Sequence, residues 1–158
     1  MSSDAEALLG EKDELKEKPF SVLIALNRDA QPAVTDVARK LTELFPKLEP
    51  VRDIVEDETG FGLTVSGSIV VFVRMPGAIP LDPAMDAPTI NEPLTAATLD
   101  TQRAYLVIAV REREPIQAAI VATEVAAAVA ECCLGAIAVY WPASRQWFAP
   151  QVFVDQAV

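Results

Sequence analysis

Cysteine and carboxylate side chains are the groups with which this sequence could do chemistry, because it contains no histidine. Without histidine, Ser-His-Asp and Cys-His catalysis, histidine metal sites and histidine pH switches are excluded. The phosphate-binding patterns GxxxxGK[ST] and GxGxxG do not occur either. The adjacent thiols of Cys132 and Cys133 fall at the C-terminal end of a predicted helix, where the helix dipole disfavours an anion. We therefore interpret them as core residues rather than nucleophiles.

Five carboxylates crowd the stretch LEPVRDIVEDETG at residues 48–60. Such a density suits a hard cation or a paired acid and base. The stretch lacks the DxDxDG spacing of a calcium loop, and alternation on an exposed strand or turn explains it as well. We interpret it as a solvated acidic edge, and we predict no metal, no catalytic residue and no cofactor. The five residues are Glu49, Asp53, Glu56, Asp57 and Glu58.

Glu124 and two arginines are further candidates. A lone carboxylate in an apolar helix is a catalytic candidate if burial raises its pKa. Gln117 and Glu131, seven residues to either side, share its helical face and favour an exposed polar stripe instead. Arg111 and Arg113 could bind an anion, but they alternate with glutamates, which favours a surface ladder of ion pairs.

The stretch YWPASRQWF at residues 140–148 is the strongest interaction candidate. It combines four aromatic side chains with an arginine, and Trp, Tyr and Arg are enriched at binding hot spots. We predict that these side chains contact a partner protein. In the alternative, the first two aromatic residues cap the core at the end of the sheet. The residues are Tyr140, Trp141, Arg145, Trp147 and Phe148.

The composition indicates a folded, acidic chain. Of its 158 residues, 51% are hydrophobic and 23% are charged, which is typical of one globular domain. We predict a mobile charged tail over residues 1–18 and a single α/β domain over residues 19–158. The formal net charge of -10 disfavours nucleic acid and anionic membranes. The charge is compatible with basic proteins, small molecules and cations as partners. In the alternative, it serves solubility alone.

The cysteine pattern and the N-terminal residues favour the cytoplasm. Two adjacent cysteines make no disulfide framework. The first 19 residues have neither the basic region nor the continuous apolar run of a signal peptide. We therefore expect a cytoplasmic protein.

Hydrophobic periodicity predicts the elements that must position these groups. Short apolar runs at residues 20–27 and 104–113 are typical of buried strands, the first of them central in its sheet. Residues 33–45 form an amphipathic helix that Pro46 stops, and SGS at residues 66–68 is a hairpin turn. A long connection over residues 77–100 follows. The helix after residue 114 then completes a strand-helix-strand unit with parallel strands.

The order of elements, β-α-β-β(-β)-β-α-β, predicts the fold class. Two helices can cover one face of a sheet. We predict an α/β (α+β) two-layer sandwich with a mixed, mostly antiparallel sheet and two main helices on one face, related to the ferredoxin-like arrangement.

The helix PIQAAIVATEVAAAVAECC is apolar on most of its circumference. It is long enough to span a membrane, but the central carboxylate of Glu124 costs about 2.5–3.5 kcal/mol in a bilayer. We predict a crossover helix of a soluble protein, with its alanine face on the core and burial nearly all round. Its cover would be the first helix, the connection over residues 77–100, or a second copy of the chain.

Three short stretches resemble a bacterial domain-of-unknown-function family, number 4261. They are Ala78 to Pro80, the strand RAYLVIAV, and AVYWPASRQWFAP. The family pattern has Pro-Ile-Pro at the first stretch, and histidines where Gln102 and Tyr105 stand here. The resemblance covers residues 20–158 and implies a fold and a bacterial source, because the family has no assigned reaction. A role that depends on those histidines does not carry over.

These observations favour a non-enzymatic protein-interaction domain. It would either form a homodimer or bind a basic partner protein, and the second case includes an immunity-like, toxin-neutralising role. The alternative is a small-molecule-binding or enzymatic domain. Its site would lie between the connection over residues 77–100 and the strand ends, and it would use Arg74, Arg103, Arg111 and the acidic groups.

Overall fold

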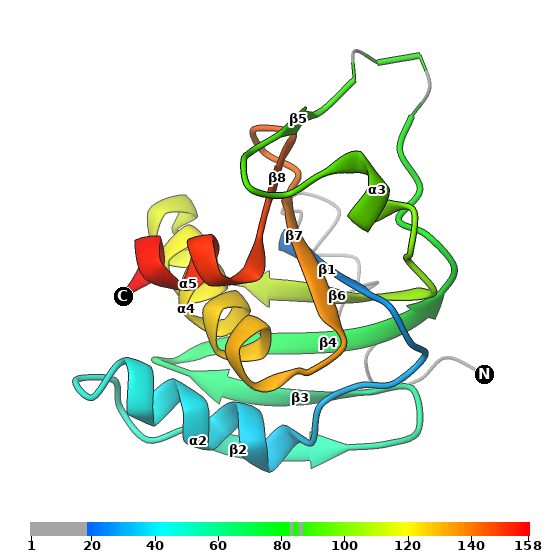
Figure 1. Cartoon of the computed structure of the whole chain (residues 1–158). Coiled ribbons are helices and arrows are strands. Elements are labelled where there is room, and N and C mark those ends of the chain that lie inside the picture. Colours follow the sequence, from blue (N-terminus) through cyan, green and yellow to red (C-terminus); the bar gives the residue numbers. More distant parts are fainter. Residues whose placement is uncertain (1–18, 83, 86) are drawn as a thin grey trace.

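β1 (Phe20–Leu26) lies inside the sheet, as its apolar run predicts. The computed structural model describes residues 19–82, 84–85 and 87–158, so the predicted tail over residues 1–18 lies outside the described residues. β1 pairs with β6 (Ala104–Arg111) on one side and β7 (Ala136–Trp141) on the other (Figure 1). Beyond β6 follow β4 (Ser68–Pro76), β3 (Gly60–Val65) and β2 (Arg52–Glu56). Beyond β7 follow β8 (Gln146–Phe148) and β5 (Thr89–Ile90).

Strand directions confirm the predicted mixed, mostly antiparallel sheet. In the described residues, β5 and β8 form a parallel pair and the other neighbouring strands are antiparallel. α4 (Pro115–Cys132) connects β6 to β7. These two strands are parallel, as predicted, with β1 between them. The order β7-β1-β6-β4, with α2 (Val34–Leu44) after β1, is the split βαβ order of the ferredoxin-like arrangement.

The predicted hairpin joins β3 and β4. Ser66 and Gly67 form its two-residue turn, with φ values of 49° and 82°. Both residues are therefore left-handed, as in the turns whose twist suits a two-residue hairpin. Val65 pairs with Ser68 directly across the turn, so the register of the two strands follows from it.

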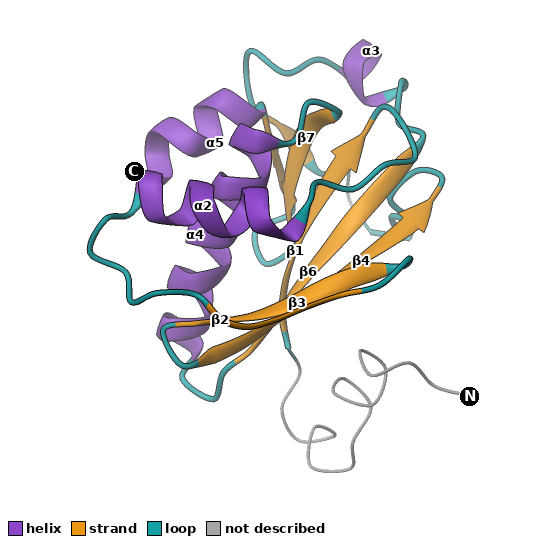
Figure 2. Cartoon of the chain, turned by 90° about the horizontal axis from the view of Figure 1, so that it is seen from below, coloured by secondary structure: helices purple, strands orange, loops and turns teal. Residues whose placement is uncertain are grey.

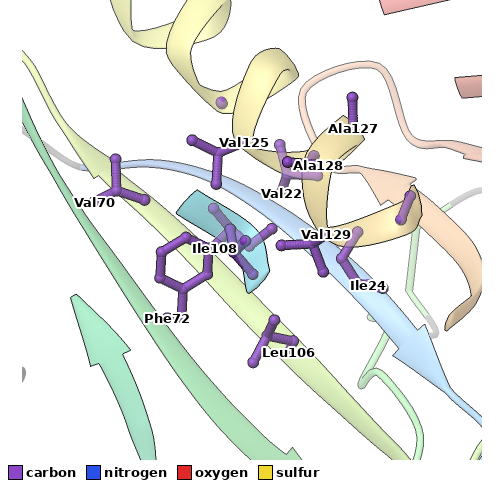
Figure 3. Packing of buried hydrophobic residues seen from close by; sticks show 14 of the residues in the cluster. Val22, Ile24, Val70, Phe72, Leu106, Ile108, Val125, Ala127, Ala128 and Val129 are labelled. Carbon is purple, nitrogen blue, oxygen red and sulfur yellow. The ribbon is translucent and has the colours of Figure 1, made fainter. Parts of the chain in front are cut away.

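The main core lies between the sheet and the helices. Figure 2 shows α2, α4 and α5 (Pro150–Ala157) on one face of the sheet. Alternate side chains of β1, β3, β4 and β6 point into this layer, as the two-residue period of a strand requires. Burying each large side chain contributes about 1.5–3 kcal/mol. Figure 3 shows several of these residues together: Val22, Ile24, Val70, Phe72, Leu106, Ile108, Val125 and Val129.

The alanine face of α4 packs on this core, as predicted. Small side chains let the helix axis approach the sheet closely, and the valines of α4 fill the space beside them. The described chain has one helix whose length and composition would allow a membrane crossing, and it is α4, half of which is buried. The inner side of the helix is therefore a packed core surface. Its buried alanines include Ala118, Ala122, Ala126 and Ala130.

The connection after β4 covers the other face of the sheet. Ile79 and Leu94 form a second cluster there with side chains of β1, β6, β7 and β8. The side-chain amide of Asn91 donates to the carbonyl oxygen of Trp147 at 2.9 Å, and Gln102 Oε1 accepts the Ile79 N–H at 3.1 Å. The connection is therefore not a cover of α4, because these bonds hold it against the opposite face.

A third helix on the helical face, α5, was not predicted. Phe153 and Val154 are its buried residues, and the helix packs against α4 and β7. It is only eight residues long, too short for a clear helical period. The two predicted main helices of this face are α2 and α4, and the structure adds the shorter α5 beside them.

Candidate interaction groove on the helical layer

The N-terminal half of α4 carries exposed apolar side chains. Ile116 is 75% exposed and Ile120 is 48% exposed. The C-terminal half is different, since Val125 and the residues up to Val129 are fully buried. Burial nearly all round was therefore wrong for the first half of the helix. α2 and α5 flank α4, but they leave Ile116 and Ile120 uncovered.

The exposed side chains of Ile116 and Ile120 line a hollow of about 530 Å³. A second hollow, of about 390 Å³, adjoins it, because Phe45 and Glu124 line both. We call the two together the α4 groove. The first is lined by Phe45, Pro115, Ile116, Ala119, Ile120, Thr123, Glu124 and Ala157. The second adds Leu44, Pro46, Lys47 and Leu48.

Local sequence explains how the groove forms. Pro115 starts α4 at its first turn, a position that tolerates proline because no intrahelical N–H is lost there. Ile116, Ile120 and Glu124 then follow at intervals of four residues, so they form one line along the helix surface. On the other side, α2 stops at Leu44. The chain turns at Pro46, which leaves Phe45 at the wall of the groove.

Glu124 lies where the two hollows meet. Burial raises the pKa of its carboxyl group above the ordinary value, because a half-buried carboxylate loses hydration. Within the described residues it forms no hydrogen bond or ion pair. Its predicted companions differ in exposure: Gln117 is half-buried and Glu131 is exposed. The polar stripe therefore exists, but Glu124 belongs to the groove rather than to open solvent.

Replacing Glu124 with glutamine is expected to stabilise the fold at neutral pH. A raised folded-state pKa means that the ionised group opposes folding at pH 7 and that this penalty fades as the pH falls through that pKa. Because the group is partly hydrated, we expect a gain of only about 0.3–0.5 kcal/mol in the free energy of unfolding. Urea unfolding at pH 7 and near pH 4.5, relative to wild type, measures it.

The control for this experiment is Glu131→Gln, which removes the same charge from an exposed site of α4. It should change the stability little at either pH. A loss of stability on Glu124→Gln at pH 7 would contradict the prediction, because it would show that the carboxylate has a stabilising partner.

The predicted aromatic interaction residues divide between the two faces of the β7-β8 hairpin. Trp147 is 2% exposed and Tyr140 is 6% exposed; both belong to the second cluster, with ring centroids 4.7 Å apart. Trp141 and Phe148 are half-buried and face the helical layer, each about 6.0 Å or less from another aromatic ring. Arg145, also half-buried, lies in the turn. A partner can thus reach Trp141 and Phe148 more readily than the buried pair.

Trp141 and Phe148 also adjoin the α4 groove. They line a hollow of about 300 Å³ on the helical layer. Thr123 and Ala157 line this hollow and the first hollow of the groove alike. The predicted aromatic surface and the exposed isoleucines of α4 are therefore neighbours, although Ile120 and Trp141 are 21 residues apart in sequence.

The other candidate groups do not assemble into a site. β2 is exposed along its whole length, and Asp57 accepts hydrogen bonds from Thr59 and Gly60 that lower its pKa. Among the described residues, no three metal-binding side chains cluster. The interpretation of a solvated acidic edge agrees with this exposure.

The three arginines of the alternative small-molecule site lie at the two ends of β6. Arg74 pairs with Asp29 at 3.1 Å, near the start of β6, where Arg103 also lies. Arg111 ends the same strand, roughly 26 Å away along it. One ligand of ordinary size cannot contact all three.

The cysteines agree with their interpretation as packing residues. Both are half-buried and unbridged. Burial raises the pKa of Cys132 to about 11 and raises that of Cys133 as well. At neutral pH the reactive thiolate form is therefore scarce.

The comparisons with known proteins return nothing: no family model, curated protein or solved structure matches this chain. The fold and the groove define its class, an α+β two-layer sandwich with an open apolar groove on its helical layer. The resemblance to family 4261 stays a prediction. Its three stretches do meet in space, because Ile79, Tyr105 and Tyr140 share the second cluster.

Sequence reasoning missed the groove itself. The prediction of a helix buried nearly all round included Ile116 and Ile120, and Phe45 and Ala157 were not candidates for a site. The spacing of Ile116, Ile120 and Glu124 shows that they share a helical face, but which faces of a helix stay open depends on its neighbours.

Proposed function

We propose that this chain is a non-enzymatic protein-interaction domain that binds an amphipathic helix of a basic partner protein in the α4 groove. The observation that carries the proposal is the exposure of Ile116 and Ile120 inside a hollow of about 530 Å³. Binding would remove both side chains from water. Helix-in-groove recognition uses such apolar anchors one turn apart.

The lining of the groove favours a protein segment over a small molecule. The volume alone suits either. Small-molecule sites also have several polar groups that converge on the ligand, whereas the first hollow offers only Thr123 and Glu124. The hydroxyl of Thr123 already donates to the Ala119 carbonyl oxygen at 2.7 Å. An apolar helix face needs no further polar partners.

Charge favours a basic partner over a second copy of the chain. The net charge is -10, so two copies repel each other while a basic protein is attracted. A twofold dimer through the groove would also place the same surface on both sides and would bring two Glu124 carboxylates into one apolar contact. A basic helix places opposite charge there instead.

The sheet edges are poor alternatives as docking sites. β2 is an edge strand with an irregular register between Arg52 and Val55 and a left-handed residue at Asp53. At the other edge, β5 has only two residues. Bulged or very short edge strands resist pairing with another chain. This leaves the helical layer as the surface that best supports association.

Substituting Ile120 with lysine is expected to abolish binding to a basic amphipathic helix. The probe is a synthetic helix of Leu and Lys about 14 residues long, with Leu on one face. Burying a new ammonium group opposite the lysines of the probe should weaken binding at least tenfold. Fluorescence anisotropy of the labelled peptide, titrated with each variant, measures this.

The matched control is Leu134→Lys, which adds the same charge at an 89% exposed site just after α4. It should bind the probe as wild type does. Light scattering of the free protein decides the alternative: a wild-type dimer at micromolar concentration that Ile120→Lys dissociates would show that a second copy occupies the groove. Equal binding by both variants would also contradict the proposal.

A further inference from the structure

Glu124 is the one acidic side chain that lines the α4 groove among the described residues. We infer that it recognises a single lysine or arginine of the partner helix and thereby selects basic partners. The inference rests on the proposed interaction function and adds to it a residue that determines specificity. It predicts a definite pattern in the partner, which the apolar contact alone does not.

The first support is the position of the carboxylate relative to the apolar anchors. Glu124 follows Ile116 and Ile120 on the same line of α4, about 12 Å from Ile116 along the helix axis. It lies at the junction of the two hollows. A helix that covers both isoleucines therefore also covers this carboxylate and removes more of its hydration.

The second support is that, among residues 19–82, 84–85 and 87–158, no cation pairs with Glu124. Lys47, from the segment after α2, lines the smaller hollow, yet it causes no shift in the pKa of Glu124. Lys40 of α2 is held by Glu43 at 2.9 Å. α5 contributes only Ala157 to the groove. On α4 itself, the polar neighbours of the same stripe are Gln117 and Glu131.

A carboxylate that is covered by a bound helix but has no ionic or hydrogen-bond partner destabilises the complex. The bound helix must therefore supply a positive charge or a hydrogen-bond donor to Glu124. Removing one member of a buried charged pair leaves the other desolvated and unpaired. The partner helix should therefore carry two apolar side chains one turn apart. A lysine or arginine should follow about two turns from the first of them. A partner with glutamate at that position should be rejected.

The test uses two probe peptides and one pair of variants. The first peptide is the Leu and Lys helix described above with one change: a lysine stands on its apolar face two turns from the first of two leucines. The second peptide replaces each lysine with glutamate. Glu124→Gln should weaken binding of the Lys peptide on the order of fivefold. Glu131→Gln, which removes the same charge outside the groove, should leave binding within about twofold. Glu124→Lys should gain affinity for the Glu peptide.

The outcomes separate this inference from the proposed function. If wild type binds neither peptide, the proposed function fails. If wild type binds the Lys peptide and Ile120→Lys abolishes binding, the function stands. In that case, equal losses for Glu124→Gln and Glu131→Gln would overturn the inference, because they would show attraction by net charge alone. No gain for Glu124→Lys would overturn it as well.

Discussion

Replacing Trp147 with alanine is expected to lower the free energy of unfolding by about 3–5 kcal/mol, the cost of removing a buried aromatic side chain. The indole is 2% exposed and packs beside the ring of Tyr140. The backbone of the same residue holds the connection over residues 77–100, because its carbonyl oxygen accepts from both the backbone and the side chain of Asn91. The cavity would thus open where that connection meets the sheet.

Urea unfolding monitored by far-UV circular dichroism measures this loss. Trp141→Ala is the comparison, because the indole of Trp141 is half-buried on the helical face of the same hairpin; its loss should be smaller. A loss below about 1 kcal/mol for Trp147→Ala would show that the second cluster contributes little. The burial of Trp147 also matters for binding experiments. If Trp147→Ala weakened binding of a partner, the cause would be a damaged fold. Direct contact with a partner therefore has to be tested at Trp141 and Phe148.

Gly60→Ala is expected to lower the free energy of unfolding by about 3 kcal/mol, at the upper end of the usual cost of overpacking. A Cβ atom at this position would lie 1.9 Å from the carbonyl oxygen of Phe72. The obstacle is backbone, so no side-chain rotation relieves it. Gly60 also closes the turn in which Asp57 accepts two backbone N–H groups, those of Thr59 and Gly60. The pairing of β3 with β4 would have to shift at this end.

Gly62→Ala is the matched control, two residues along the same strand. Its added Cβ would meet the Val55 side chain at 3.4 Å, which is ordinary contact. We expect a change within about 1 kcal/mol of either sign, since alanine also reduces the entropy of the unfolded chain. Thermal unfolding of the two variants gives the comparison. Equal midpoints would contradict the clash at Gly60.

The two faces of the sheet differ in how completely they are covered. On one face the connection after β4 closes the second cluster with Ile79 and Leu94. On the other face three helices cover the sheet, but the N-terminal half of α4 keeps Ile116 and Ile120 in water. Contact with water is unfavourable for the two exposed isoleucine side chains, and a bound helix would remove them from water. This is the physical reason for the proposal that a partner binds at the helical layer.

Short-range patterns predicted most of the elements, because helices and strands differ in the spacing of their apolar residues. The apolar run of β1, the helical spacing of Val34, Val37 and Leu41, and the Ser66–Gly67 turn all appear where the sequence placed them. The parallel directions of β6 and β7 followed from the helix that connects them. The missed elements, α5, β8 and β5, have eight, three and two residues, too few for a helical or strand period to stand out from a loop.

The sequence by itself determined the fold class, the central strand, the acidic surface and the lack of histidine chemistry, because local periodicity and composition decide these properties. Tertiary structure alone decided which half of α4 is covered, which face of the sheet the connection closes, and whether Trp147 is core or surface. These depend on contacts between residues far apart in the chain. Phe45, Glu124 and Ala157 share one groove only because α2, α4 and α5 pack side by side, and no local pattern encodes that packing.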